Sequence, residues 1–110
     1  MNLTKEQVKK IIEKVHLDLD LDYSSKYPII ANYTENHKDF KIDIWGGGYD
    51  YRDPEAVGDN GWGIYTEWVI IIDDKKEEAV MYGYYTGRFL IKLNENGKYE
   101  HVKRVGINKK

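Results

Sequence analysis

The chain of 110 residues contains no cysteine. Disulfide bonds, thiolate nucleophiles and cysteine-ligated metals are therefore excluded, and the chain is compatible with a reducing compartment. It also lacks a long apolar run at its start. Because the stretch MNLTKEQVKKIIEK carries charges through every helical turn, we expect neither a secretory signal nor a membrane span, and we predict a cytoplasmic protein.

Side chains suited to catalysis are scarce as well. The two serines, Ser24 and Ser25, lie outside any glycine-flanked nucleophile elbow. The three histidines, His16, His37 and His101, do not have the spacing of a zinc site. We therefore predict a protein that is not an enzyme and that needs no metal or cofactor.

Two acidic features leave alternatives open. In the run LDLDLD, Asp18, Asp20 and Asp22 would share one face of an extended segment and could bind a hard cation, although the glycine of a calcium-binding loop is missing. We interpret this run as the end of a helix. Glu67 lies in a strongly apolar run, where burial would favour a general acid, but pairing with a basic residue on a neighbouring strand is the simpler interpretation.

Composition indicates a folded protein. Hydrophobic residues make up 41% of the chain, charged residues 33% and aromatic residues 14%. Disordered chains have too little apolar surface to offset the entropy lost on folding, and these proportions are instead those of globular domains. Because 110 residues leave little length for a second core, we predict a single domain over residues 1–110.

The N-terminal pattern predicts a helix that begins at Lys5. Thr4 is placed as its N-cap, Gln7 completes a capping box, and Leu3 and Val8 have the spacing of a hydrophobic staple. An apolar stripe at helical spacing continues through Ile11, Ile12 and Val15. Such a stripe needs a sheet on which to pack.

After Pro28 the pattern changes to strands. Runs over residues 28–33 and 39–45 predict a hairpin in which Phe40, Ile42 and Ile44 share a face. The run from Gly63 to residue 72 is apolar on both faces and predicts a central strand, and runs over 77–85, 88–93 and 98–105 complete a meander. We predict an α+β fold, with one N-terminal helix packed on a twisted antiparallel sheet of about six strands.

Charge is divided along the chain, and the acidic part is rich in glycine. From Leu17 to Asp59 there are ten acidic and four basic residues, and the balance reverses after Ala79. The stretch WGGGYDYRDPEAVGDNGWG, residues 45–63, holds six of the ten glycines. It does not match the glycine patterns of phosphate-binding loops, and its acidic residues would repel phosphate or nucleic acid.

The same segment suits a basic protein partner. Aromatic residues are common interface anchors, and acidic residues around them steer a cationic surface into contact. We therefore predict a protein interface, with no membrane and no nucleic acid bound at this surface. Its predicted residues are Trp45, Tyr49, Asp50, Tyr51, Asp53, Glu55, Asp59 and Trp62.

Tyrosine residues predict a second, alternative surface. Small-molecule sites combine aromatic walls with a few convergent polar groups. Tyrosine is also a good strand former, so packing of the sheet explains these residues equally well. The alternative ligand-binding residues are Tyr65, Tyr82, Tyr84, Arg88 and His101, with Arg88 and His101 binding an anionic group.

A small, cysteine-free, acidic chain with one helix, an antiparallel sheet and an aromatic acidic loop resembles the small bacterial toxin-immunity proteins. The resemblance is one of general organisation over the whole chain and carries over no functional residue. It implies a protein that blocks the active site of a toxin, such as a nuclease with a basic cleft. Phage-encoded inhibitors of bacterial defence systems have the same general organisation, so both roles stay open.

Overall fold

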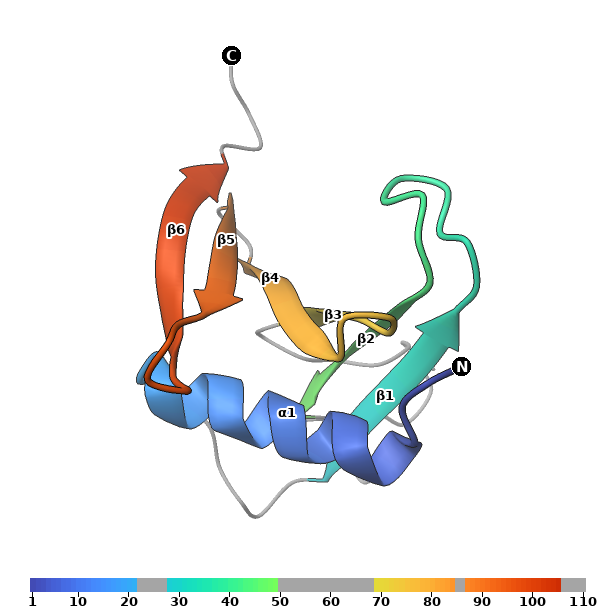
Figure 1. Cartoon of the computed structure of the whole chain (residues 1–110), viewed down its shortest axis with the longest axis horizontal. Coiled ribbons are helices and arrows are strands. Elements are labelled where there is room, and N and C mark those ends of the chain that lie inside the picture. Colours follow the sequence, from blue (N-terminus) through green and yellow to red (C-terminus); the bar gives the residue numbers. More distant parts are fainter. Residues whose placement is uncertain (22–27, 50–68, 85–86, 106–110) are drawn as a thin grey trace, which may run out of the picture.

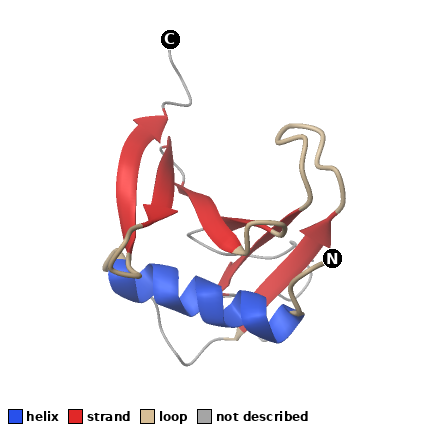
Figure 2. Cartoon of the chain, viewed as in Figure 1, coloured by secondary structure: helices blue, strands red, loops and turns tan. Residues whose placement is uncertain are grey.

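A computed structural model of the chain describes residues 1–21, 28–49, 69–84 and 87–105. These residues form one helix and a six-stranded antiparallel sheet, which confirms the predicted α+β fold (Figures 1 and 2). The elements are α1 (Lys5–Asp18), β1 (Ile29–Thr34), β2 (Ile44–Tyr49), β3 (Val69–Asp73), β4 (Glu78–Tyr84), β5 (Gly87–Leu93) and β6 (Tyr99–Val105).

The helix α1 begins as its sequence predicts. The Thr4 side chain accepts a hydrogen bond from the Gln7 amide at 3.2 Å, and the Gln7 side chain accepts one from the Thr4 amide at 2.8 Å. This reciprocal capping box satisfies two amides that the first turn leaves without partners. Its apolar stripe is buried, since Val8, Ile12 and Val15 are each 0% exposed.

The six strands form a simple meander. Each strand pairs with its neighbours in the chain in the order β1-β2-β3-β4-β5-β6, and every pairing is antiparallel. The helix α1 crosses one face of this sheet and contacts all strands except β5 (Figure 1). The core lies between them and contains Ala31, Trp45, Tyr49, Ile70, Ile72, Ala79, Tyr82, Ile91 and Tyr99. We call this side of the sheet the inner face.

The first hairpin differs from its prediction. The strand β2 begins at Ile44 rather than at Asp39, because Lys41 has a φ of 64° that ends any extended conformation there. It then continues through the three glycines to Tyr49, which the sequence suggested as part of a loop. A Cβ built on Gly47 would overlap the backbone of Ile30, so the close approach of β1 requires glycine at this position.

Two β-bulges interrupt the alternation of side chains in the second half of the sheet. Ile71 pairs with Met81 and Ile72 with Ala79, which leaves Val80 as an extra residue in β4. In the same way, Leu90 pairs with Lys103 and Ile91 with His101, which leaves Val102 as an extra residue in β6. A bulge moves the residues beyond it onto the opposite face from the one that strict alternation predicts.

In the part of the chain that the structure describes, no helix is both long enough and apolar enough to cross a bilayer.

Candidate ligand site on the sheet

Two of the eight residues predicted to bind a protein partner lie in the core. Trp45 is 4% exposed and Tyr49 is 3% exposed, and both belong to the hydrophobic cluster under α1. They point to the inner face with Gly47, because alternate residues of β2 share a face. Their burial corrects the expectation that they are surface anchors. The other six residues, Asp50, Tyr51, Asp53, Glu55, Asp59 and Trp62, lie outside the described residues.

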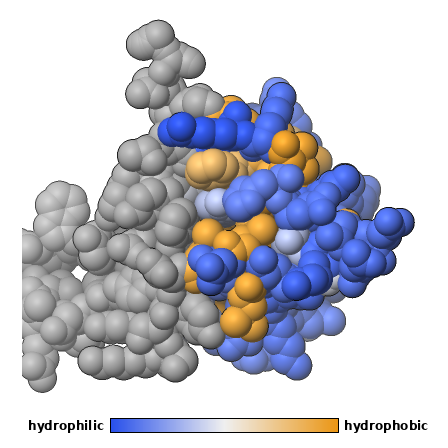
Figure 3. Space-filling model, turned by 90° about the vertical axis from the view of Figure 1, so that its left-hand side faces the viewer, coloured by the Kyte–Doolittle hydropathy of each residue, from blue (hydrophilic) through white to orange (hydrophobic). Residues whose placement is uncertain are grey.

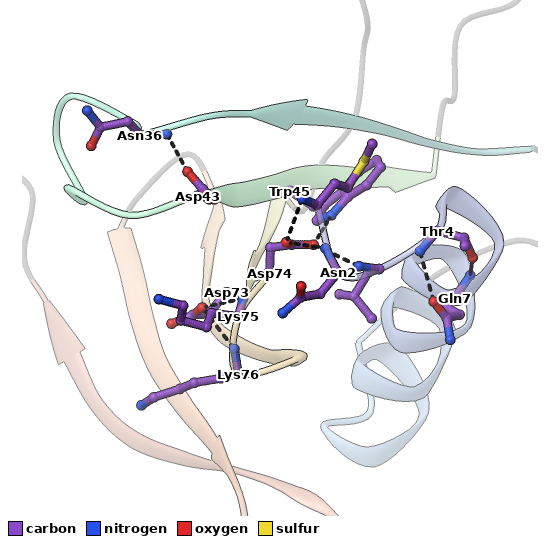
Figure 4. A network of polar contacts seen from close by, with 12 residues as sticks. Asn2, Thr4, Gln7, Asn36, Asp43, Trp45, Asp73, Asp74, Lys75 and Lys76 are labelled. Carbon is purple, nitrogen blue, oxygen red and sulfur yellow. Dashed lines mark hydrogen bonds and ion pairs between the residues drawn. The ribbon is translucent and has the colours of Figure 1, made fainter.

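Trp45 instead belongs to a buried polar cluster around Asp74, shown in Figure 4, which we call the Asp74 cluster. The Asp74 carboxylate accepts hydrogen bonds from the Trp45 indole at 2.9 Å, the Leu3 amide at 2.9 Å and the Asn2 amide at 2.6 Å. The N-terminal amine of Met1 lies 4.0 Å away. The cluster therefore fastens the chain before α1 to β2 and to the turn after β3.

The environment of Asp74 favours its ionised form. Burial on its own raises the pKa of this carboxyl, but the hydrogen bonds from Asn2, Leu3 and Trp45 and the N-terminal charge together hold the pKa below its ordinary value. The side chain is enclosed, since Asp74 is 3% exposed. Each of these partners comes from the folded chain, so we assign the Asp74 cluster a structural role.

A second polar cluster lies on the inner face of β4, β5 and β6, and we call it the Tyr82 cluster. Its members are Tyr82, Phe89, His101 and Arg104. The Tyr82 hydroxyl and His101 Nε2 are 2.6 Å apart and share a hydrogen bond. The Phe89 ring stacks with Tyr82 at 5.0 Å between centroids, meets His101 edge-on at 5.6 Å, and has the Arg104 guanidinium 5.8 Å above it.

The register of the sheet produces this arrangement. Tyr82 pairs with Phe89, and Phe89 pairs with Arg104, so the three side chains form one row across three strands. His101 pairs with Ile91, two residues along β5 from Phe89 and therefore on the same face. The row runs from a buried tyrosine to an exposed arginine, and burial raises the pKa of the Tyr82 hydroxyl.

The structure brings together part of the predicted tyrosine surface. Tyr82 and His101 are in contact, as an aromatic wall with a polar group requires. Arg88 is adjacent to Phe89 in β5, so its side chain is exposed on the opposite face. Tyr65 and the side chain of Tyr84 are outside the described residues.

The other tyrosine of this region has a structural contact. The Tyr99 hydroxyl accepts a hydrogen bond from the Ala79 amide at 3.0 Å, and the Tyr99 amide donates one to Asp18 Oδ2 at 2.9 Å. Asp18 also pairs with Lys14 at 3.1 Å. Asp18 is the last residue of α1 and connects the helix to β6. The interpretation of LDLDLD as a helix end is therefore confirmed at Asp18. Asp22 lies outside the described residues.

No metal site is formed by the residues that the structure describes, where no three histidine, aspartate or glutamate side chains come together. Glu67, the candidate general acid, lies outside these residues. His16, in the last turn of α1, is 1% exposed and packs edge-on against Tyr49 at 4.9 Å.

The chain was compared with protein-family models, curated proteins and solved structures, and none of them matches it. Its function is therefore inferred from its own residues.

Three residues of these clusters are not among those predicted from the sequence: Asp74, Phe89 and Arg104. Asp74 follows the strongly apolar strand β3, directly after Asp73, and its burial depends on donors more than twenty residues away in the chain. A bulge places Arg104 on the inner face, and no residue of KYEHVKRV signals that bulge. For Phe89 a signal was available, since it alternates with Ile91 and Leu93 in β5.

Proposed function

We propose that this protein is a non-catalytic inhibitor or immunity protein that acts in the cytoplasm by binding a basic protein, such as a toxin or nuclease. The interface we propose is residues 50–68. One observation supports it most directly. These residues join β2 to β3, and Gly47 of β2 pairs with Ile70 of β3 in the middle of the sheet. The segment between β2 and β3 therefore connects two adjacent interior strands, and it contains Asp50, Asp53, Glu55 and Asp59.

Charge supports a basic partner. The five acidic residues of this segment, Asp50, Asp53, Glu55, Asp59 and Glu67, are accompanied by one base, Arg52. Acidic residues at an interface accelerate association with a cationic surface, and salt screens this effect. With Trp45 and Tyr49 in the core, the aromatic residues that remain of the predicted interface set are Tyr51 and Trp62.

A charge-reversal experiment tests the interface. Tagged protein is used to capture partners from lysate of its source cells, which are eluted with rising salt and identified by mass spectrometry. With the partner in hand, Asp50→Lys combined with Asp53→Lys should slow association and flatten its salt dependence. The matched control, Glu35→Lys with Asp39→Lys, makes the same charge change at exposed residues of the β1–β2 connection, at the other end of these strands.

The comparison of the two variants decides the proposal. Slower association for the first variant and near-normal association for the control support an interface in residues 50–68. Equal association rates for both variants and the unmodified protein contradict it.

The second candidate function is binding of a small molecule or nucleotide at the Tyr82 cluster. The observation that favours it is the 2.6 Å contact between the Tyr82 hydroxyl and His101, beside a half-buried Phe89 ring and the exposed Arg104 side chain. Aromatic surfaces with a few oriented polar groups are typical of ligand sites. A ligand retained through purification would appear as extra mass in native mass spectrometry, and its loss in Phe89→Ala would locate it.

A further inference from the structure

The connection between β1 and β2, residues 35–43, contains a turn built around His37, and we call this connection the His37 loop. The His37 carbonyl accepts a hydrogen bond from the Lys41 amide at 2.6 Å. The ring adds further contacts, because its Nδ1 accepts from the Asp39 amide at 3.0 Å and from the Phe40 amide at 3.4 Å. His37 therefore holds the turn through both its main chain and its side chain.

The His37 ring occupies the place of an N-cap side chain. An N-cap acceptor bonds the amides two and three residues along the chain, which here are those of Asp39 and Phe40. Asn36 and Lys41, on either side of this turn, have positive φ values of 48° and 64°. Residues other than glycine keep this unfavourable conformation only where surrounding contacts hold it, and the bonds to the His37 ring are such contacts.

The base of the His37 loop is held separately. Asp43 Oδ1 accepts a hydrogen bond from the Asn36 amide at 2.7 Å, which Figure 4 shows beside the Asp74 cluster. The Asp43 carbonyl accepts a second bond, from the Asp74 amide at 3.1 Å. Neither bond involves the His37 ring, so a change at the ring alters the tip of the loop and leaves its base in place.

The bonds to the ring require a neutral His37. A neutral imidazole has one nitrogen that accepts a hydrogen bond, whereas a protonated imidazole carries N–H groups on both nitrogens and accepts none. Protonation of Nδ1 therefore places a donor against the amides of Asp39 and Phe40. Histidine is the side chain that ordinarily changes its charge between about pH 5 and pH 8.

We propose that the His37 loop is a pH-sensitive switch, in which the neutral ring holds the turn closed and protonation of Nδ1 opens it. Opening removes both bonds to the ring and separates His37 from the Phe40 ring, whose centroid lies 5.0 Å away. The half-buried Phe40 side chain is then released towards solvent.

Charged groups of both signs surround the switch, so its test must separate His37 from the carboxylates. Those of its own loop and of the turn after β3, which contacts the loop at Asp43, are Glu35, Lys38, Asp39, Lys41, Asp43, Asp73, Asp74, Lys75 and Lys76.

The switch does not depend on either candidate function. The His37 loop joins β1 and β2 at one edge of the sheet, whereas the Tyr82 cluster lies towards β6 at the other edge (Figure 1). Figure 3 shows the side of the molecule that contains β6, where the described residues are largely hydrophilic between smaller apolar patches. His101, on β6, is therefore a distant histidine that serves as an internal reference.

The test is heteronuclear NMR of the full chain between about pH 8 and pH 5, the range in which histidine titrates. We expect the amide signals of Asp39 and Phe40 to shift with the same midpoint as the His37 ring. The Asp39 signal should shift more, because its bond to the ring is the shorter one. Titration of the His37 ring without a shift at these two amides overturns the proposal.

Two variants at His37 test the role of the ring. In His37→Asn the side-chain oxygen can accept the same two amides and does not titrate, so the turn should stay closed over the whole pH range. His37→Ala has no acceptor, so at pH 8 its Asp39 and Phe40 signals should shift in the direction that acid produces in the unmodified protein. A pH response retained in His37→Asn, or unchanged signals in His37→Ala, overturns the switch.

Asp39→Asn and His101→Gln are the matched controls, because each removes another titratable group and leaves the His37 ring in place. A Phe40 amide that responds to pH in both controls and not in His37→Asn supports the proposal. Loss of the response in Asp39→Asn would assign it to the carboxylate, and loss in His101→Gln to the other histidine, and either result overturns the proposal.

Discussion

The Asp74 cluster and the Tyr82 cluster each join an aromatic side chain of the sheet to polar groups, but they differ in exposure. Asp74 and Trp45 are 3% and 4% exposed, and their polar atoms are satisfied by the chain itself. In the Tyr82 cluster only Tyr82 is buried, while His101 and Arg104 are exposed. The Asp74 cluster is therefore closed to solvent, whereas the Tyr82 cluster is open to it.

This difference has an energetic meaning. A buried donor that loses its acceptor cannot recover a hydrogen bond from water, so removing one partner costs about 1–3 kcal/mol for each group left behind. An exposed group regains most of that energy from solvent. Equivalent substitutions in the two clusters should therefore reduce the free energy of unfolding by different amounts.

The largest effect is expected for Asp74→Ala. Removal of the carboxylate leaves the Trp45 indole and the amides of Asn2 and Leu3 without their acceptor. We expect the free energy of unfolding to fall by about 3 kcal/mol or more, as buried donors lose their partner. Urea denaturation measures this change. A loss below about 1 kcal/mol would show that water reaches these donors and that the two clusters are not different.

Trp45→Phe should have the next largest effect. Phenylalanine keeps an aromatic ring in the core but removes the indole N–H that donates to Asp74 at 2.9 Å. A carboxylate that remains buried with one donor fewer, together with the smaller ring, should lower the free energy of unfolding by about 2 kcal/mol. The combination with Asp74→Ala should cost less than the sum of the two single variants, because both remove the same contact.

The pH dependence of the free energy of unfolding gives a third test of the Asp74 cluster. The pKa of Asp74 is below its ordinary value of 3.8 in the folded chain, so the unfolded chain binds more protons in the interval between the two values. The stabilisation from Asp74 is complete above the unfolded pKa and is lost as the pH falls through the folded one. The difference in unfolding free energy between the unmodified protein and Asp74→Asn should therefore shrink below about pH 4.

The helix next to the Asp74 cluster could be predicted from the sequence, but the contacts of Asp74 could not. The capping box, the start of α1 and the buried stripe from Val8 to Val15 depend on neighbours within one or two helical turns, and all are confirmed. Asp74 depends on the pairing of the N-terminal segment with a turn 71 residues away. Alternation of hydrophobic residues contains no information on such a contact.

In the Tyr82 cluster, Tyr82 and His101 could be predicted from the sequence, but Arg104, which follows the bulge in β6, could not. Tyr82 and His101 were identified because aromatic and titratable residues recur on neighbouring strands. Strict alternation from His101 selects Lys103 as its neighbour on the same face, and only the observed register identifies Arg104. The burial of Trp45 was also not predictable from local sequence. The three glycines that suggested a loop are part of β2, and Gly47 lets β1 approach closely.

A smaller effect is expected when one hydrogen-bonding group is removed from the open cluster. Tyr82→Phe keeps the ring and deletes the hydroxyl that lies 2.6 Å from His101 Nε2. Because His101 is exposed, water can replace the lost partner, and the free energy of unfolding should fall by about 1 kcal/mol or less. Tyr99→Phe is the matched control: its hydroxyl accepts from the buried Ala79 amide, so the same deletion should cost more.

Arg104→Gln should have the smallest effect on stability of these variants. The guanidinium lies 5.8 Å above Phe89 at an exposed position, where a cation–π contact contributes about 0.5–1 kcal/mol. Glutamine retains part of the packing, so we expect a loss of about 0.5 kcal/mol in urea denaturation. A larger loss, comparable to that of Asp74→Ala, would place Arg104 among the residues that hold the sheet together. A loss of about 0.5 kcal/mol would instead show that this part of the Tyr82 cluster contributes less to folding than the Asp74 cluster does.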